Sequence, residues 1–304
     1  MKFDVIIIGG GAAGISAALW CDDLKLNALL LEADAELGGQ LLWTYNAIKN
    51  HLGTETESGR EMRDVFLKQI ENRRFTLRLN AEIAALDCSR KSVSLTGGEK
   101  FSAGALIIAS GVRRRKLRVE GEEKFKDAGF IESGKRDAAL VKDKKVCIVG
   151  GGDAAFENAL ILAKTASAVT LIHRGKTFRA RAEFVEPARR NPKISILTET
   201  VVEKIVGDKH IEAVELKNLR TKTTFRLDVQ AILRRIGVEP NTELVRGQTD
   251  LDENGYIRVS ATGATSRAGI FAAGDVANPF APTVSTAVGT GATAVKAILE
   301  LLNS

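Results

Sequence analysis

The sequence is poor in the residues that build disulfide frameworks and metal sites. Its 304 residues include only three cysteines and three histidines. Cys21, Cys88 and Cys147 are far apart, with no C-x-x-C spacing, and no two histidines share one helix face. These patterns predict neither a disulfide scaffold nor a metal site. We expect Cys21, at the end of a helix, and Cys147, in an apolar strand, to be buried and inert.

Long hydrophobic runs are also missing. No apolar segment approaches the roughly 20 residues that a membrane helix needs. The apolar residues 5–8 are too few for a secretory signal, and they end at three glycines without a cleavage site. A hydrophobic content of 44% with 27% charged residues is typical of a globular chain, and the length suits two domains. We therefore predict a cytoplasmic protein without a membrane partner.

The chain is mildly basic, with a formal net charge of +6. The densest basic cluster is residues 113–116, followed by Arg118. No aromatic residues interleave with these cations and no recognition motif accompanies them, so nucleic acid is not an expected partner. The cluster has two other interpretations. It is either a solvated connector, which we favour, or a surface that docks an acidic partner or attracts phosphates.

The N-terminal segment has the pattern of a dinucleotide-binding turn. Phe3–Ile8 is a continuous apolar run, as in a buried parallel strand, and it leads into Gly9-x-Gly11-x-x-Gly14 at the start of a helix. Glu32 ends the next apolar strand, a little over 20 residues on, where a ribose hydroxyl needs an acceptor. The glycines allow the backbone to approach a pyrophosphate, and the helix start supplies N–H donors.

A second copy of this pattern begins at Lys145. The strand 145–149 leads into Gly150-x-Gly152-x-x-Ala155, and strand 169–172 is followed by His173-Arg174. An acid at the end of that strand would accept from a free ribose hydroxyl, whereas arginine fits a 2′-phosphate. Arg179 and Arg181 follow closely. The second site is therefore predicted to prefer NADP(H) to NAD(H), the alternative being a solvated basic turn without discrimination.

Several further segments have recognisable patterns. Gly38-Gly39-Gln40 could lie against a second ring system, and Trp43 and Tyr45 either flank that ring or pack in the core. Gly274-Asp275 follows an apolar strand, and its carboxylate suits a polyol hydroxyl. We expect helices over 59–72 and 287–302 and strands over 75–79, 83–86, 92–95, 105–108, 257–259 and 270–273.

Together these residues resemble the thioredoxin-reductase-like branch of the flavoproteins called pyridine nucleotide-disulfide oxidoreductases. The resemblance covers essentially the whole chain and rests on residues 9–14, 38–40, 107–111, 150–155, 173–179 and 271–275. It implies an α/β fold with two Rossmann-like domains of the three-layer ββα/βαβ type. Residues 1–114 and 241–304 would form a discontinuous FAD-binding domain, and residues 115–240 an inserted NAD(P)H-binding domain.

The resemblance also implies which residues bind the cofactors. It implies a homodimer as well, because homodimers are usual in the family. FAD would be held by Gly9, Gly11, Ala12, Ala13, Gly14, Glu32, Ala33, Gly39, Gln40, Asn50, Ala109, Ser110, Gly111, Gly274 and Asp275. NADPH, with NADH possible, would be held by Gly150, Gly152, Asp153, Ala154, Ala155, His173, Arg174 and Arg179.

The chain departs from the family at the redox-active C-x-x-C, which an aspartate follows. This window reads Ser133-Gly134-Lys135-Arg136-Asp137, so the aspartate is kept and both cysteines are replaced. Serine cannot carry electrons as a dithiol does, which excludes the usual relay to thioredoxin. No side chain is therefore a certain catalytic residue. If Arg136 faces the flavin, it could stabilise an anionic reduced flavin.

Two further motifs are incomplete. The H-R-R-x-x-x-R phosphate clamp has Gly175 in place of its middle arginine, which weakens the NADPH preference unless Lys176 or Arg181 compensates. The Arg-Gln pair that relatives place near the flavin is Pro282-Thr283.

We predict an FAD-dependent NAD(P)H oxidoreductase that passes electrons to an unidentified protein or small molecule. The alternatives are a ferredoxin- or flavodoxin-NADP reductase-like enzyme, a reductase whose dithiol comes from a partner chain, and a flavin-binding sensor or scaffold with little turnover.

Overall fold

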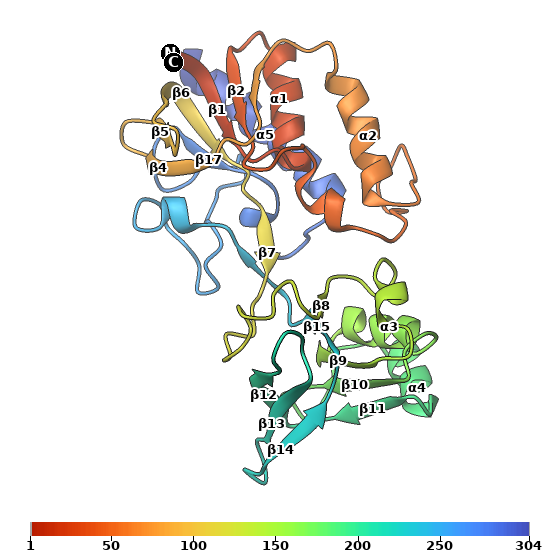
Figure 1. Ribbon diagram of the computed structural model, residues 1–304. Helices are drawn as coiled ribbons and strands as arrows, with labels where there is room; N and C mark the ends of the chain where they lie inside the picture. Colours follow the sequence, from red (N-terminus) through yellow and green to blue (C-terminus); the bar gives the residue numbers. More distant parts are fainter. Residues whose placement is uncertain (1, 304) are drawn as a thin grey trace. The chain divides into compact units, whose positions relative to one another are not determined.

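The chain folds into two compact units. The computed structural model describes residues 2–303. Unit 1 comprises the residues up to Arg113 together with those from Glu239 onward, and unit 2 is Arg114–Val238 (Figure 1). The chain passes between the units twice, at β7 (Val112–Arg114) and β16 (Val238–Pro240), and these two short strands pair with each other.

Unit 1 is built on a seven-stranded sheet in the order β3-β2-β1-β6-β5-β4, with β17 also paired to β6. The strands are β1 (Lys2–Ile8), β2 (Ala28–Leu31), β3 (Thr76–Arg78), β4 (Ile83–Asp87), β5 (Ser92–Leu95), β6 (Lys100–Ile108) and β17 (Ile270–Ala272). The pairs among β1, β2, β3, β6 and β17 are parallel, whereas β4 and β5 add antiparallel pairs. The last four residues of β1, 5–8, are all apolar and buried because both faces of the sheet are covered. Ile7 packs into one core cluster and Ile6 into the other.

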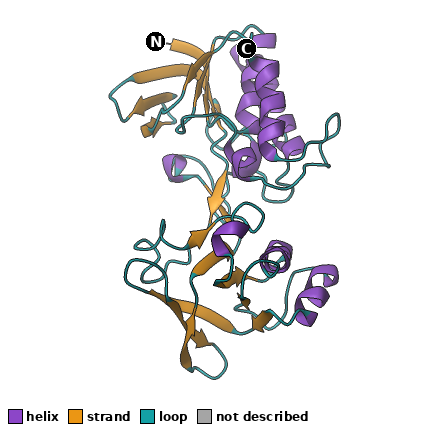
Figure 2. Ribbon diagram, turned by 45° about the vertical axis from the view of Figure 1, so that its right-hand side comes forward, coloured by secondary structure: helices purple, strands orange, loops and turns teal. Residues whose placement is uncertain are grey.

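Three helices cover one face of this sheet, as Figure 2 shows. They are α1 (Ala12–Asp23), α2 (Gly59–Ile70) and α5 (Val284–Asn303). Helices α1 and α5 come into close contact at Gly291, where a Cβ atom would lie 2.3 Å from the Ala13 carbonyl oxygen. Ser16 Oγ on α1 also donates to the Val288 carbonyl on α5, at 2.8 Å. The C-terminal helix is therefore bound directly to the helix that follows the first glycine turn.

Unit 2 has a five-stranded parallel sheet in the order β11-β10-β9-β15-β8. These strands are β8 (Phe130–Ile131), β9 (Lys145–Gly150), β10 (Ala168–Ile172), β11 (Ile194–Leu197) and β15 (Ala231–Arg235). Helices α3 (Asp153–Leu162) and α4 (Ala182–Arg190) pack on one face. An antiparallel sheet of β12 (Thr200–Val206), β13 (Ala213–Asn218) and β14 (Thr224–Asp228) packs on the other. Strand β9 has β10 on one side and β15 on the other, so the strand order reverses there. This switch point is where such sheets bind dinucleotides.

The predicted fold class is confirmed, with local corrections. Residues 257–259 do not form a strand, because Ile257 makes only one isolated bridge, to Leu251. Helix α5 starts three residues before the predicted position, and α2 ends two residues early, at Ile70. The three antiparallel strands of unit 2 were not predicted. Among the described helices, none has the length and apolarity that a membrane crossing requires.

Candidate dinucleotide sites

The first glycine turn brings the ends of β1 and β6 together. Gly9 has φ +107°, and a Cβ atom there would lie 2.4 Å from the Ala109 carbonyl oxygen. At Gly14 a Cβ atom would lie 1.9 Å from the Gly9 carbonyl oxygen, so only glycine lets α1 pack onto the turn. Gly11 caps α1 without a side-chain hydrogen bond. The first amides of this helix are therefore available to an anion.

Glu32 stands at the end of β2, beside this turn. Its side chain is 9% exposed and accepts hydrogen bonds from the Gly10 amide at 2.6 Å and the Asp34 amide at 2.9 Å. Each bond uses a different carboxylate oxygen, and a carboxylate has about four lone-pair sites in all. Glu32 therefore positions the turn and retains acceptor capacity for ribose hydroxyls.

The Gly38-Gly39 pair lies against the same turn. The Gly38 amide donates to the Gly10 carbonyl at 2.9 Å, and a Cβ atom at Gly39 would lie 3.1 Å from the Gly11 Cα. Gln40 Nε2 donates to the Val112 carbonyl at 2.8 Å, so this amide also holds the protein's own backbone. Trp43 is 47% exposed, which does not agree with core packing.

Ser110 and Gly111 follow β6 and are held by Asn241, a residue that the sequence analysis did not assign to a site. Ser110 Oγ donates to the Asn241 carbonyl at 2.7 Å, and Asn241 Nδ2 donates to the Ser110 carbonyl at 2.8 Å. The Asn241 amide also donates to the Gly111 carbonyl, at 3.0 Å. The two residues are 131 positions apart in the chain, so no local pattern could have paired them.

Asp275 is a carboxylate near the first glycine turn, and its side chain has no protein partner among the described residues. Gly274 has φ +74°, and a Cβ atom there would lie 2.8 Å from the Ala13 Cβ, so Asp275 sits beside the start of α1. Burial raises the pKa of Asp275. Within residues 2–303 its side chain makes no hydrogen bond or ion pair. A desolvated carboxylate with unused acceptors fits a hydroxyl-bearing ligand such as the ribityl chain of FAD.

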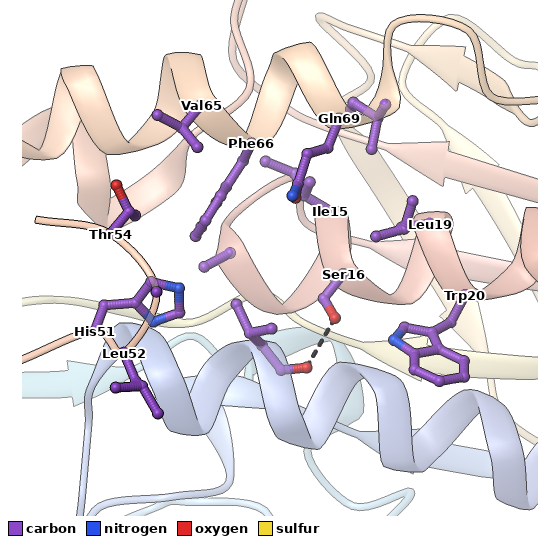
Figure 3. A pocket seen from close by; sticks show the side chains of 14 residues that line it. Ile15, Ser16, Leu19, Trp20, His51, Leu52, Thr54, Val65, Phe66 and Gln69 are labelled. Carbon is purple, nitrogen blue, oxygen red and sulfur yellow. Dashed lines mark hydrogen bonds between the residues drawn. The ribbon is translucent and has the colours of Figure 1, made fainter.

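A cavity of about 360 Å³ lies between α1, α2, α5 and the loop 51–54 (Figure 3). Apolar side chains such as Leu19, Val65 and Phe66 form much of its wall, and His51 Nδ1 lies 3.0 Å from Ser285 Oγ at one side. Of the residues predicted to bind a cofactor, only Ala12 lines it.

The second glycine turn, in unit 2, also follows a parallel strand and starts a helix. One of its glycines, Gly152, has free space around it. Gly150 pairs with Arg235 across β9 and β15, and a Cβ atom at Gly150 would lie 2.3 Å from the Arg235 carbonyl oxygen. Gly152 caps α3 without a side-chain hydrogen bond, and nothing lies within 4 Å of a Cβ atom there. Ala155 takes the place of the third glycine and is fully buried. The turn is open to a ligand at Gly152 and closed to side chains at Gly150.

The His173 side chain packs against this turn. A Cβ atom at Gly151 would lie 2.2 Å from His173 Nδ1, so the imidazole lies directly against the turn. Nε2 is 2.9 Å from the Thr177 carbonyl, which can only accept, so Nε2 carries the proton. A Cβ atom at Gly175 would lie 2.8 Å from Nε2, which explains why the middle residue of the clamp is small.

Three cations of the predicted phosphate clamp have no partner among the described residues. Arg174, Lys176 and Arg179 are exposed, and their side chains make no ion pair or hydrogen bond within the described chain. The Arg179 amide donates to the Gly151 carbonyl at 3.0 Å, which ties the clamp loop to the turn. Arg181, one of the two residues that could compensate for the lost arginine, is engaged elsewhere in this structure. Its guanidinium pairs with Asp153 at 2.8 Å and with Glu183 at 2.7 Å.

Residues 133–137, where the resemblance places the family's C-x-x-C, form a loop that internal hydrogen bonds hold in place. Asp137 is 3% exposed and accepts from the Glu132 amide at 2.7 Å, the Ser133 amide at 3.1 Å and the Arg136 guanidinium at 2.5 and 2.8 Å. Burial alone would raise the pKa of Asp137, but these hydrogen bonds outweigh it and lower the pKa. Asn158 Oδ1 accepts from the Gly134 amide at 2.7 Å, which binds the loop to α3.

The basic connector is largely neutralised by internal partners. Arg113 pairs with Glu239 and Glu243, and Lys116 pairs with Glu123. Arg115 Nε donates to the Val238 carbonyl at 2.8 Å. These contacts favour a connector over a surface that docks an acidic partner.

The three cysteines are free and buried, as expected for Cys21 and Cys147. Burial raises the pKa of Cys21 and of Cys147 to about 12, and it also raises the pKa of Cys88. None of them is a nucleophilic thiolate at neutral pH. No group of three or more metal-binding side chains occurs in residues 2–303.

Comparisons with known proteins agree with this geometry. A family model described as pyridine nucleotide-disulphide oxidoreductase matches residues 3–296. Thioredoxin reductase of Mycolicibacterium smegmatis is 38% identical over 294 residues, which cover 96% of this chain and 94% of that protein. Thioredoxin reductase of Streptomyces coelicolor is 36% identical over 296 residues, which cover 96% of this chain and 91% of that one.

Solved structures give the same result. The thioredoxin reductase of Lactococcus lactis superposes with a TM-score of 0.87 at 31% identity, over 99% of each chain. That of T. acidophilum superposes with a TM-score of 0.84 at 26% identity, over 100% of this chain and 99% of the other. The resemblance predicted from the motifs is confirmed, and with it a flavin-dependent enzyme family that uses FAD and NADPH. The chain belongs to the pyridine nucleotide-disulphide oxidoreductase family, with thioredoxin reductases as its relatives.

Proposed function

We propose that the protein oxidises NADPH through FAD and passes the electrons on without a dithiol of its own. The loop at residues 133–137 carries this proposal. Ser133 and Arg136 stand where the resemblance to the family places redox-active cysteines, and Arg136 is bound to the buried Asp137. The three cysteines of the chain are elsewhere and buried, so none of them can replace the missing pair.

The residues of unit 1 fit FAD. The open amides at the start of α1 suit the pyrophosphate, Glu32 suits the adenosine ribose, and the unpartnered Asp275 suits a ribityl hydroxyl. The residues of unit 2 fit NADPH. Gly152 opens α3 to a second pyrophosphate, and the exposed, unpaired Arg174 and Arg179 suit the 2′-phosphate. When bound, FAD would take a hydride from NADPH and release the electrons to an acceptor.

The internal pairing of the connector reduces the support for an acidic protein such as ferredoxin as the acceptor. An acceptor that reacts directly with reduced flavin, such as a quinone, needs neither a dithiol nor a docking surface. We therefore place small-molecule acceptors first.

The test is anaerobic reduction of the purified holoenzyme with NADPH. We expect the flavin absorbance to bleach within seconds while the number of titratable thiols stays constant. The matched control is the double variant Ser133→Cys, Arg136→Cys, in which two new thiols should appear on reduction. Reduction of thioredoxin by the unaltered protein would overturn the proposal.

A second candidate is a flavin-binding sensor or scaffold with little turnover. Its support is the loss of function-bearing residues at three places: the cysteine pair, Gly175 in the phosphate clamp and Pro282-Thr283. Absence of bleaching by both NADPH and NADH, in protein that retains its flavin, would favour this candidate.

A further inference from the structure

Two neighbouring arginines at the end of β15 have very different surroundings. The Arg234 guanidinium pairs with the buried Glu122 at 2.8 Å and with Glu132 at 3.4 Å, and it lies over the Phe130 ring. Arg234 is therefore a half-buried charge that two carboxylates compensate. Arg235 is mostly buried too, but within residues 2–303 it makes no ion pair with any carboxylate.

The hydrogen bonds of Arg235 use only neutral acceptors. Nη1 donates to the Arg234 carbonyl at 2.9 Å, and Nη2 donates to the Glu132 carbonyl at 2.7 Å and, at 3.5 Å, to Asn158 Oδ1. These bonds hold the side chain between the loop that leaves β8 and helix α3. Nε and a second Nη1 hydrogen remain unused, because a guanidinium has five N–H donors.

Arg235 is charged at neutral pH. Burial, followed by the nearby Arg114 guanidinium, lowers the pKa of Arg235 to about 10, although the carboxylates of Glu132, Glu157 and Asp137, which lie too far away to form ion pairs, partly oppose this shift. A buried charge without an ionic partner is costly to a folded protein. An anion supplied by a ligand would relieve this cost.

The position of Arg235 identifies the ligand group. Gly150, the first residue of the second glycine turn, pairs with Arg235 across β9 and β15. Arg174, at the end of β10, lies on the other side of β9. Suppose that Arg174 binds the 2′-phosphate of a dinucleotide and that the adenosine-side phosphate of its diphosphate lies at the start of α3. The rest of the ligand then extends toward β15. The next anionic group along such a ligand is its second phosphate.

We propose that Arg235 binds the second phosphate of the NADPH diphosphate and so adds a cation to the nucleotide site of unit 2. This inference rests on the proposed function, because it requires that unit 2 binds NADPH. Arg235 is then a binding residue. It recovers part of the nucleotide affinity that is lost because Gly175 stands in place of the middle arginine of the 2′-phosphate clamp. Charge-assisted hydrogen bonds of this kind contribute about ten- to hundredfold in affinity.

The test is calorimetric binding to the FAD-loaded protein, with ligands that differ in the second phosphate. NADP⁺ and 2′-phospho-ADP-ribose carry it, and adenosine 2′,5′-bisphosphate does not. We expect Arg235→Met to weaken binding of the first two by about ten- to hundredfold, and of the bisphosphate by less than about threefold. Arg235→Lys should retain part of the affinity, because it keeps the charge.

Arg226→Gln is the matched control. It removes one cation from unit 2 at an exposed position on β14, where Arg226 pairs with Asp228. It should leave the affinity for all three ligands unchanged. Equal losses for the bisphosphate and for NADP⁺ on Arg235→Met, or no loss at all, would overturn the inference.

If Arg235→Met does not fold, the lysine variant and the unaltered protein still test whether Arg235 binds the second phosphate. The unaltered protein should bind 2′-phospho-ADP-ribose at least about tenfold more tightly than the bisphosphate, and the absence of that gain contradicts the proposal. If the unaltered protein does not bind NADP⁺, this inference and the proposed function both fail. If NADP⁺ binds as expected but NADPH does not bleach the flavin, only the proposed function fails.

Discussion

Asp137 should be the main stabiliser of the loop at residues 133–137, where the resemblance places the family's C-x-x-C. Its buried carboxylate accepts from the Glu132 and Ser133 amides and from Arg136. In Asp137→Ala, both amides lose their acceptor, and each unsatisfied buried donor costs about 1–3 kcal/mol. The Arg136 pair adds little, because its guanidinium is 38% exposed and screened by water. We expect the two amides together to cost the loop about 2–6 kcal/mol of stability.

Asp137→Asn is the matched control. Its amide oxygen can still accept from the two backbone amides, so what is lost is the charge and the acceptor for the exposed Arg136 Nε, and we expect a cost of roughly 1 kcal/mol. The pH dependence separates the two contributions. Because the pKa of Asp137 is lowered in the folded state, the charge stabilises above the unfolded value of about 3.9. This stabilisation is lost as the pH falls through the folded value, so wild type and Asp137→Asn should converge in acid.

The assay can distinguish the two units. Both tryptophans, Trp20 and Trp43, lie in unit 1, so their fluorescence reports unit 1 alone. Hydrogen exchange of peptides spanning 130–137 reports the loop in unit 2. We expect Asp137→Ala to accelerate exchange at these amides and to leave the tryptophan-detected urea transition unchanged. Unchanged exchange of the Glu132 and Ser133 amides, or an equal shift of the tryptophan transition, would refute the reasoning.

Three further predictions concern the cofactor sites. Gly14→Ala should prevent FAD retention and lower the stability of unit 1, because its Cβ would lie 1.9 Å from the Gly9 carbonyl oxygen; normal flavin absorbance in the purified variant would contradict this. Asp275→Asn should weaken FAD binding by about tenfold in a flavin-release titration, since a desolvated acceptor is replaced by a weaker one. Arg174→Gln and Arg179→Gln should each weaken NADPH binding about tenfold and NADH binding little, and equal losses for both nucleotides would exclude a 2′-phosphate contact.

The glycine turns could be predicted from the sequence because their physical requirements are local. An apolar strand, a glycine cluster and a helix follow one another within about a dozen residues in both copies. Glu32 could be predicted as well, since it ends the next strand, and parallel neighbouring strands place their carboxyl ends at one edge. The structure adds that Glu32 already accepts from the Gly10 amide.

Other features depended on partners that are distant in the sequence. Asn241 holds Ser110 across 131 positions, and Asn158 holds Gly134 across 24, and neither pair has a sequence signature. The basic connector was predicted as one cluster, but only the fold shows which carboxylates neutralise Arg113 and Lys116.

The sequence by itself determined the two glycine turns, the fold class and the absence of any C-x-x-C spacing, because each depends on residue types at short spacing. The tertiary structure decided which charges are compensated. Arg234 and Arg235 are adjacent and identical in type, yet Arg234 forms an ion pair with the buried Glu122, whereas Arg235 forms no ion pair within residues 2–303. That difference arises from which segments the fold brings next to each guanidinium, since burial and ion pairing depend on neighbours in space rather than along the chain.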